Sequence, residues 1–173
     1  MKLFVDTGKV KEIEALASLG ILDGVTTNPS LLAKEKGDAR QILKQICQLV
    51  KGPVSAEVVA TDYAGMISEG RDLASIDEHI VIKVPFTKDG VRACRTLASE
   101  GQRVNVTLIF SATQAWLAAK VGATYVSPFV GRLDDIGTTG MNLVREIVDI
   151  FDNYEVTTEV LLASGRHPIH IVE

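Results

Sequence analysis

The chain has 173 residues, of which 46% are hydrophobic, and a formal net charge of −4. This composition predicts one globular domain over residues 1–173, and the lack of basic runs argues against nucleic-acid or polybasic membrane binding. Small molecules or other subunits are the expected partners. No apolar run approaches the roughly 20 residues of a membrane span, which predicts a cytoplasmic protein. Cys47 and Cys94 lack a CxxC spacing and are predicted to be reduced core thiols.

Short β-branched runs alternate with longer segments of helical period along the chain. Strands are predicted at residues 3–6, 24–27, 54–59, 80–84, 103–110, 125–130 and 159–163. Helices are predicted at residues 10–19, 38–50, 62–74, 88–99, 112–121, 139–152 and from about 168 onward. Such alternation indicates a parallel sheet covered by helices, either a doubly wound open sheet or a (β/α)8 barrel.

Polar side chains late in these strands favour the barrel. They come from different βα units and include Asp6, Asn28, Glu57, Lys83, Thr107, Ser127 and Arg132. One such residue is usually a helix cap or a turn former. A series of them is expected where strand ends converge on one mouth, as in a (β/α)8 barrel. No GxGxxG follows the first strand, where a dinucleotide-binding fold would have it.

Lys83 lies near the end of the apolar strand at residues 80–85. Burial there disfavours the ammonium and favours a neutral, nucleophilic amine, which makes Lys83 a candidate for Schiff-base chemistry. The alternative is a strand-end lysine that extends its charged group into water.

Four motifs identify a family. They are Asp-Gly-Val-Thr-Thr-Asn-Pro-Ser-Leu at 23–31, Ile-Lys-Val-Pro at 82–85, Asn-Val-Thr-Leu-Ile-Phe at 105–110 and Ser-Pro-Phe-Val-Gly-Arg-Leu-Asp at 127–134. In this order they closely resemble the transaldolase family, in the short subfamily that includes the fructose-6-phosphate aldolases. The resemblance implies a TIM barrel with seven βα units in this chain and the eighth missing.

The resemblance also implies roles for the catalytic residues. Lys83 would form an imine with a ketose phosphate, and the protonated imine would act as the electron sink for C3–C4 cleavage. Asp6 would take the proton of a substrate hydroxyl, and Glu57 would move protons through a water held by Thr107. No metal or other cofactor is implied. The remaining matched positions would bind substrate, and they are Thr27, Asn28, Asn105, Ser127 and Phe129.

Two arginines are candidates for phosphate binding. Arg132 follows Gly131, whose small size allows close approach, and Ser164 and Arg166 form a second candidate phosphate-binding site in the loop after the seventh strand. Each alone is more often a surface salt-bridge partner. Gly165 departs from the branched apolar residue usual in the subfamily, which predicts a looser loop around Arg166.

Two other clusters could be mistaken for metal sites. His167 and His170 form an HxxH without a third ligand, so a metal site is not expected there. Asp134 and Asp135 lie in a segment, residues 131–140, predicted to be a solvated loop that contacts a neighbouring element.

The activity expected is transaldolase, the transfer of a dihydroxyacetone unit between sugar phosphates of the pentose phosphate pathway. Fructose-6-phosphate aldolase is the alternative, but its members carry glutamine at Glu57 and tyrosine at Phe129. A non-catalytic protein is the other alternative, because an eighth unit of about 30 residues is missing. Complete members form homo-oligomers, ring pentamers or decamers, whereas the 173-residue form is expected to be weakly active and to associate through its open strand edges.

Overall fold

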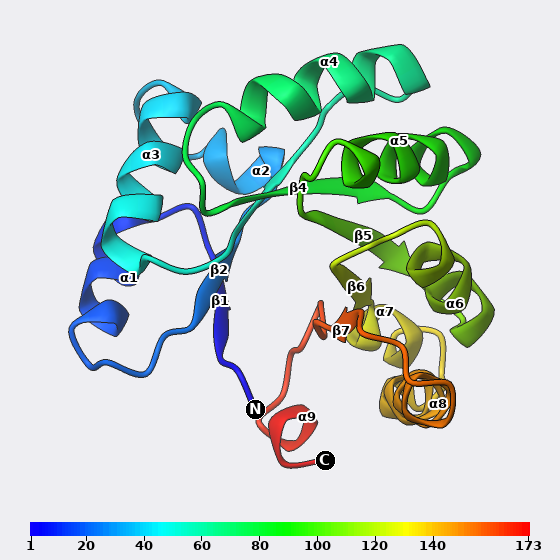
Figure 1. The fold of residues 1–173 in the computed structure, drawn as a ribbon. Coiled ribbons are helices and arrows are strands. Elements are labelled where there is room, and N and C mark those ends of the chain that lie inside the picture. Colours follow the sequence, from blue (N-terminus) through cyan, green and yellow to red (C-terminus); the bar gives the residue numbers. More distant parts are fainter. The chain divides into compact units, whose positions relative to one another are not determined.

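A computed structural model describes all 173 residues. It contains two compact units, Met1–Lys83 and Val84–Glu173, each built from parallel strands that alternate with helices (Figure 1).

The first unit contains strands β1 (Phe4–Asp6), β2 (Gly24–Thr26), β3 (Val54–Glu57) and most of β4 (Ile80–Pro85). Each strand pairs in parallel with the next one in the sequence. The helices of this unit are α1 (Val10–Ala17), α2 (Pro29–Leu32), α3 (Ala39–Val50) and α4 (Tyr63–Ala74).

Helix α3 shows how the sequence builds the core of this unit. It begins where the Asp38 side chain accepts a hydrogen bond from the Arg40 N–H, and it ends at Lys51, which adopts a left-handed conformation with φ 50°. Its buried face packs against apolar residues of β2, β3 and β4, and the cluster comprises Ile13, Val25, Ile42, Leu43, Ile46, Cys47, Val54, Ala56 and Ile80. Burial of each large aliphatic side chain contributes about 1.5–3 kcal/mol.

The second unit contains strands β5 (Val104–Ile109), β6 (Tyr125–Pro128) and β7 (Glu159–Val160), which pair in parallel in that order. Its helices are α5 (Lys88–Ser99), α6 (Ala112–Lys120), α7 (Val130–Asp134), α8 (Gly140–Asn153) and α9 (Ile169–Val172). A single bridge between Phe129 and Ala163 continues the pairing of β6 and β7. Side-chain caps fix the starts of α5 and α6, and Ser111 with Gln114 forms a complete capping box.

This architecture confirms the predicted α/β class with seven βα units of the (β/α)8 type. Within each unit the strand order follows the sequence, whereas a doubly wound sheet reverses its order at a switch point. No helix has the length and apolar character needed to cross a membrane. Cys47 and Cys94 are free and buried, as predicted.

Two short helices, α2 and α7, were not predicted, and several strands are shorter than expected, with β3 ending at Glu57, β5 at Ile109 and β6 at Pro128. Residues 131–140 were expected to form a loop, but the first of them belong to α7. The seventh strand was expected at 159–163, but regular pairing ends at Val160. Helices of four and five residues are too short to show a helical period, so the sequence pattern does not reveal them.

Candidate active-site residues

The predicted polar residues of the first unit lie near or beyond the carboxyl ends of their strands, whereas in the second unit Asn105 and Thr107 lie within β5 and Ser127 lies near the end of β6. In the first unit, Asp6 and Glu57 are the last residues of β1 and β3, and Lys83 is near the end of β4. This edge of a parallel sheet is where (β/α)8 enzymes have their catalytic groups.

Lys83 and Glu57 form a buried ion pair. The two residues are direct partners in the register of β3 and β4, and Lys83 Nζ lies 3.0 Å from Glu57 Oε2. The exposed fraction of the side chain is 8% for Lys83 and 19% for Glu57. Lys83 Nζ also donates to the backbone carbonyl of Thr27 at 3.4 Å. Lys83 therefore does not extend into water, and a carboxylate able to accept its proton is already in contact with it.

In the same unit, β1 and the segment that follows β2 contain three more of the predicted residues. Asp6 Oδ1 accepts a hydrogen bond from Thr26 Oγ1 at 2.9 Å, and Asp6 is exposed. Thr27 is buried and its hydroxyl donates to the Ser55 carbonyl at 2.8 Å. Asn28 caps α2, because its Oδ1 accepts from the Leu31 N–H. Thr27 and Asn28 thus have structural roles beside the substrate-binding roles predicted for them.

In the second unit, Asn105 and Ser127 form a buried polar pair. They lie on β5 and β6, and Ser127 Oγ donates to Asn105 Oδ1 at 3.0 Å. This contact engages the carbonyl oxygen of the Asn105 side chain.

Thr107 is the one residue whose buried side-chain oxygen has no hydrogen-bond partner in the structure. It is 1% exposed, and it precedes Leu108, whose φ of 60° accompanies a register shift between β5 and β6. A buried hydroxyl without a partner is costly in an apolar setting, so it marks a position where a ligand or a water would be favourable.

Phe129 follows β6 and is half-buried. Its ring centroid is 5.8 Å from that of Phe110, and the planes are inclined by 50°. The side chain contributes an aromatic surface and no proton donor.

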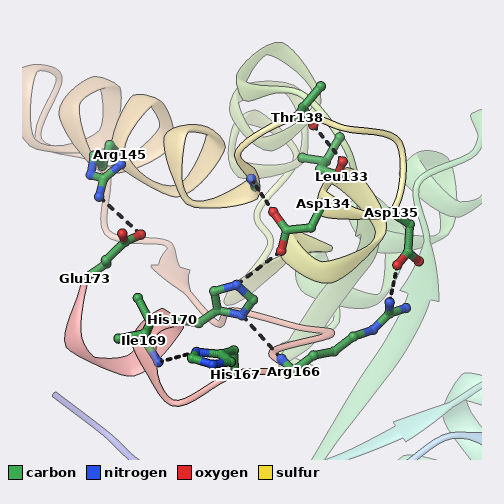
Figure 2. Close-up of polar contacts among 11 residues, drawn as sticks. Leu133, Asp134, Asp135, Thr138, Arg145, Arg166, His167, Ile169, His170 and Glu173 are labelled. Carbon is green, nitrogen blue, oxygen red and sulfur yellow. Dashed lines mark hydrogen bonds and ion pairs between the residues drawn. The ribbon is translucent and has the colours of Figure 1, made fainter.

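The two candidate phosphate-binding arginines share one carboxylate. Arg166 Nη1 forms an ion pair with Asp135 Oδ1, as Figure 2 shows, and Arg132 Nη1 lies 4.0 Å from Asp135 Oδ2. Ser164, at the start of the loop that carries Arg166, has a φ of 58°, which is uncommon for a residue other than glycine. The structure thus brings Arg132 and Arg166 to the same acidic residue, which sequence reasoning missed.

The HxxH histidines have other partners. His170 Nε2 lies 3.1 Å from Asp134 Oδ2, and Asp134 also accepts from the Gly140 N–H, so this acid joins α7, α8 and the segment at 164–173 (Figure 2). Asp134 and Asp135 therefore contact a neighbouring element, as predicted. No group of three histidine, cysteine, aspartate or glutamate residues could hold a metal ion.

The first unit also contains a cavity of about 650 Å³ among α2, α3 and α4. Its lining includes Glu57 but not Lys83 or Asp6. Lys83 is therefore not exposed to this cavity, although Glu57, its ion-pair partner, forms part of the cavity wall.

Comparison with known proteins identifies the family of the chain. The sequence profile of the transaldolase/fructose-6-phosphate aldolase family matches residues 3–173. A "Probable transaldolase" of Kosmotoga olearia is 58% identical over 173 residues, which are all of this chain and 79% of that protein. A "Probable transaldolase" of Methanococcus vannielii is also 58% identical, over 80% of its length, and one of Desulforapulum autotrophicum is 56% identical over 172 residues. The chain therefore belongs to the transaldolase/fructose-6-phosphate aldolase family.

Proposed function

We propose that the protein is a transaldolase that transfers a dihydroxyacetone unit from fructose 6-phosphate to erythrose 4-phosphate, giving glyceraldehyde 3-phosphate and sedoheptulose 7-phosphate. The observation that carries the proposal is the buried contact between Lys83 and Glu57 at 3.0 Å. A lysine with little access to water, in contact with a carboxylate that can take its proton, is suited to nucleophilic attack on a carbonyl.

In the proposed reaction, Glu57 accepts the proton of Lys83, and the neutral amine adds to the C2 carbonyl of fructose 6-phosphate. The carbinolamine hydroxyl then takes a proton from Glu57 and leaves as water, which gives the iminium. When the C3–C4 bond breaks, its electron pair moves toward the iminium nitrogen and forms an enamine. Asp6 takes the proton of the C4 hydroxyl, and glyceraldehyde 3-phosphate leaves.

The second half of the reaction reverses these steps with another aldehyde. The enamine carbon attacks the carbonyl of erythrose 4-phosphate, and Asp6 returns its proton to the new hydroxyl. Water adds to the iminium, and the Lys83 amine leaves with sedoheptulose 7-phosphate as the product. Two carboxylates in different surroundings, one buried beside a lysine and one exposed, suit these separate proton transfers.

The second unit would supply binding groups. The unpartnered hydroxyl of Thr107 supports its assignment as the group that holds the water of the carbinolamine step. Asn105, whose side chain is hydrogen-bonded by Ser127, would bind a substrate hydroxyl, as the family resemblance implies. Arg132 and Arg166 would bind the substrate phosphate, which two guanidinium groups can do with several charge-assisted hydrogen bonds.

Transfer is favoured over aldol release to water by residues 57 and 129. Family aldolases have a tyrosine hydroxyl at the position of Phe129 that can protonate the enamine, and Phe129 has none. The enamine would therefore react with an acceptor aldehyde in preference to being protonated. A homo-oligomeric, cytoplasmic enzyme of the pentose phosphate pathway is part of the same proposal.

The experiment is an assay of fructose 6-phosphate cleavage with and without erythrose 4-phosphate. We expect sedoheptulose 7-phosphate to form much faster with the acceptor than free dihydroxyacetone forms without it. Equal rates would identify the protein as an aldolase of the same family.

A further inference from the structure

We propose that the Asp135 carboxylate occupies the phosphate position of Arg166 in the free protein, and that the phosphate of the substrate must displace it. This inference deepens the proposed function, because it assigns a residue that tunes the affinity of the same site for phosphorylated sugars.

The contacts of Asp135 resemble those of a bound anion. One carboxylate oxygen forms an ion pair with Arg166, and the other lies 4.0 Å from Arg132 Nη1. These two arginines are the only polar partners of the carboxylate. Its neighbour Asp134 differs, because it accepts from the Gly140 N–H and contacts His170, which gives it a role in joining elements.

Arg166 is held where it can meet either anion. The Gly131 N–H donates to the Ser164 carbonyl at 3.0 Å, and the Arg166 N–H donates to His170 Nδ1 at 3.3 Å (Figure 2). The side chain of Arg166 passes over Gly131 so closely that a Cβ at this glycine would lie 2.9 Å from Arg166 Cδ and Nε. These contacts hold the backbone around Gly131 and Arg166 in place. The anion bound to the Arg166 guanidinium could then be exchanged without moving that backbone.

Exposure makes this exchange feasible. The side chains of Arg166 and Asp135 are 46% and 43% exposed, and that of Arg132 is 64% exposed. Ion pairs this open to solvent are weak. A phosphate dianion carries more charge than a carboxylate and offers three oxygens to the two guanidinium groups, so it competes effectively for them. The negative charge of Asp135 would also repel a phosphate bound beside it, which lowers the affinity of the two arginines for phosphate unless the Asp135 side chain moves away.

The test is isothermal titration of the 173-residue protein with inorganic phosphate at low ionic strength. The variant Asp135→Asn removes the competing charge and keeps the side-chain shape, so we expect it to bind phosphate roughly two- to fivefold more tightly than the parent. Asp149→Asn, at an exposed position of α8, makes the same change in net charge and should bind phosphate as the parent does. Arg166→Ala should lose most of the affinity.

The outcomes are distinct. Phosphate binding by Asp135→Asn but not by the parent would support the proposal in its strongest form. Equal or weaker binding by Asp135→Asn, or no binding by either protein, would overturn it. Thermal unfolding of each variant checks that the segment at 164–173 stays folded.

Failure of this inference is distinguishable from failure of the proposed function. Phosphate titration does not depend on covalent chemistry at Lys83. A gain of affinity in Asp135→Asn without covalent chemistry at Lys83 would leave the anion exchange standing and reject the transaldolase reaction. Covalent chemistry at Lys83 without a gain of phosphate affinity in Asp135→Asn would support the transaldolase reaction and reject the anion exchange.

Discussion

Lys83 on β4 and Glu57 on β3 are register partners whose side chains meet at 3.0 Å in a largely buried position. Burial of two opposite charges is costly unless they are close and hydrogen-bonded, so such a pair is weak evidence for stability alone. The proposed reaction gives the pair a use, because the carboxylate is in direct contact with the amine that would attack the substrate carbonyl.

The first prediction separates the roles of Glu57 and Phe129. Glu57→Gln keeps the shape but cannot exchange protons, so transfer of dihydroxyacetone should fall roughly 10²- to 10⁴-fold. The double variant Glu57→Gln/Phe129→Tyr introduces a hydroxyl donor and should recover cleavage of fructose 6-phosphate with release of free dihydroxyacetone. Product analysis by chromatography measures both. Full transfer activity in Glu57→Gln would show that its carboxylate is not the proton carrier.

The second prediction concerns Gly131. A Cβ at this position would lie 2.4 Å from the Ser164 carbonyl oxygen, so Gly131→Ala must displace the backbone that carries Arg166. Overpacking of this kind costs about 1–3 kcal/mol of stability, and we expect the Michaelis constant for fructose 6-phosphate to rise as well. Gly165→Ala is the matched control, because its Cβ would meet only the flexible end of Leu162, at 3.0 Å. Equal effects of the two substitutions would refute the close-approach argument.

The third prediction is a pH dependence that arises at Asp77. The backbone N–H and the ring of His79 both hydrogen-bond the Asp77 carboxylate, which holds its pKa below the usual value. A lowered pKa in the folded state contributes stability above the pKa of the unfolded chain, about 3.9, and this contribution is lost as pH falls through the folded value.

Urea unfolding between pH 7 and pH 3 measures this contribution. Asp77→Asn should lose roughly 1 kcal/mol at pH 7 and should show a smaller loss of stability toward acid than the parent. If the free energy of unfolding of the two proteins changed with pH in the same way, Asp77 would not be a source of the pH dependence.

The fourth prediction concerns thiol reactivity. Burial raises the pKa of the Cys94 thiol to about 12, so Cys94 should not form thiolate in the native protein at pH 8, and Cys47 is buried away from reagents in solution. Ellman's reagent should react with them only as fast as the protein opens, and the rate should rise with urea. Rapid reaction of the native protein would contradict the packing described for α3 and α5.

The main elements, and the location of Glu57 and Lys83 near strand ends, could be predicted from the sequence for clear physical reasons. The amphipathic period of α3 and the apolar strand at 80–85 are strong local signals. Parallel neighbours place consecutive strand ends side by side, so Glu57 and Lys83 were expected at one edge of a sheet. Their direct register was not predictable, because pairing offsets depend on how the intervening helix packs.

The contact between Asp135 and Arg166 had no local signal. It joins residues that are 31 positions apart through a loop whose course depends on the left-handed Ser164. The role of Asn28 as a cap could have been recognised, because asparagine followed by proline is typical of a helix start.

Covalent trapping at Lys83 tests the central claim most directly. The protein is incubated with fructose 6-phosphate and sodium borohydride, digested and analysed by mass spectrometry, and a single turnover is enough for detection. The account predicts a reduced three-carbon adduct on the peptide that contains Lys83 and no adduct in Lys83→Met, a substitution of similar volume. A folded parent protein that acquires no adduct, or acquires it on another lysine, would contradict the account.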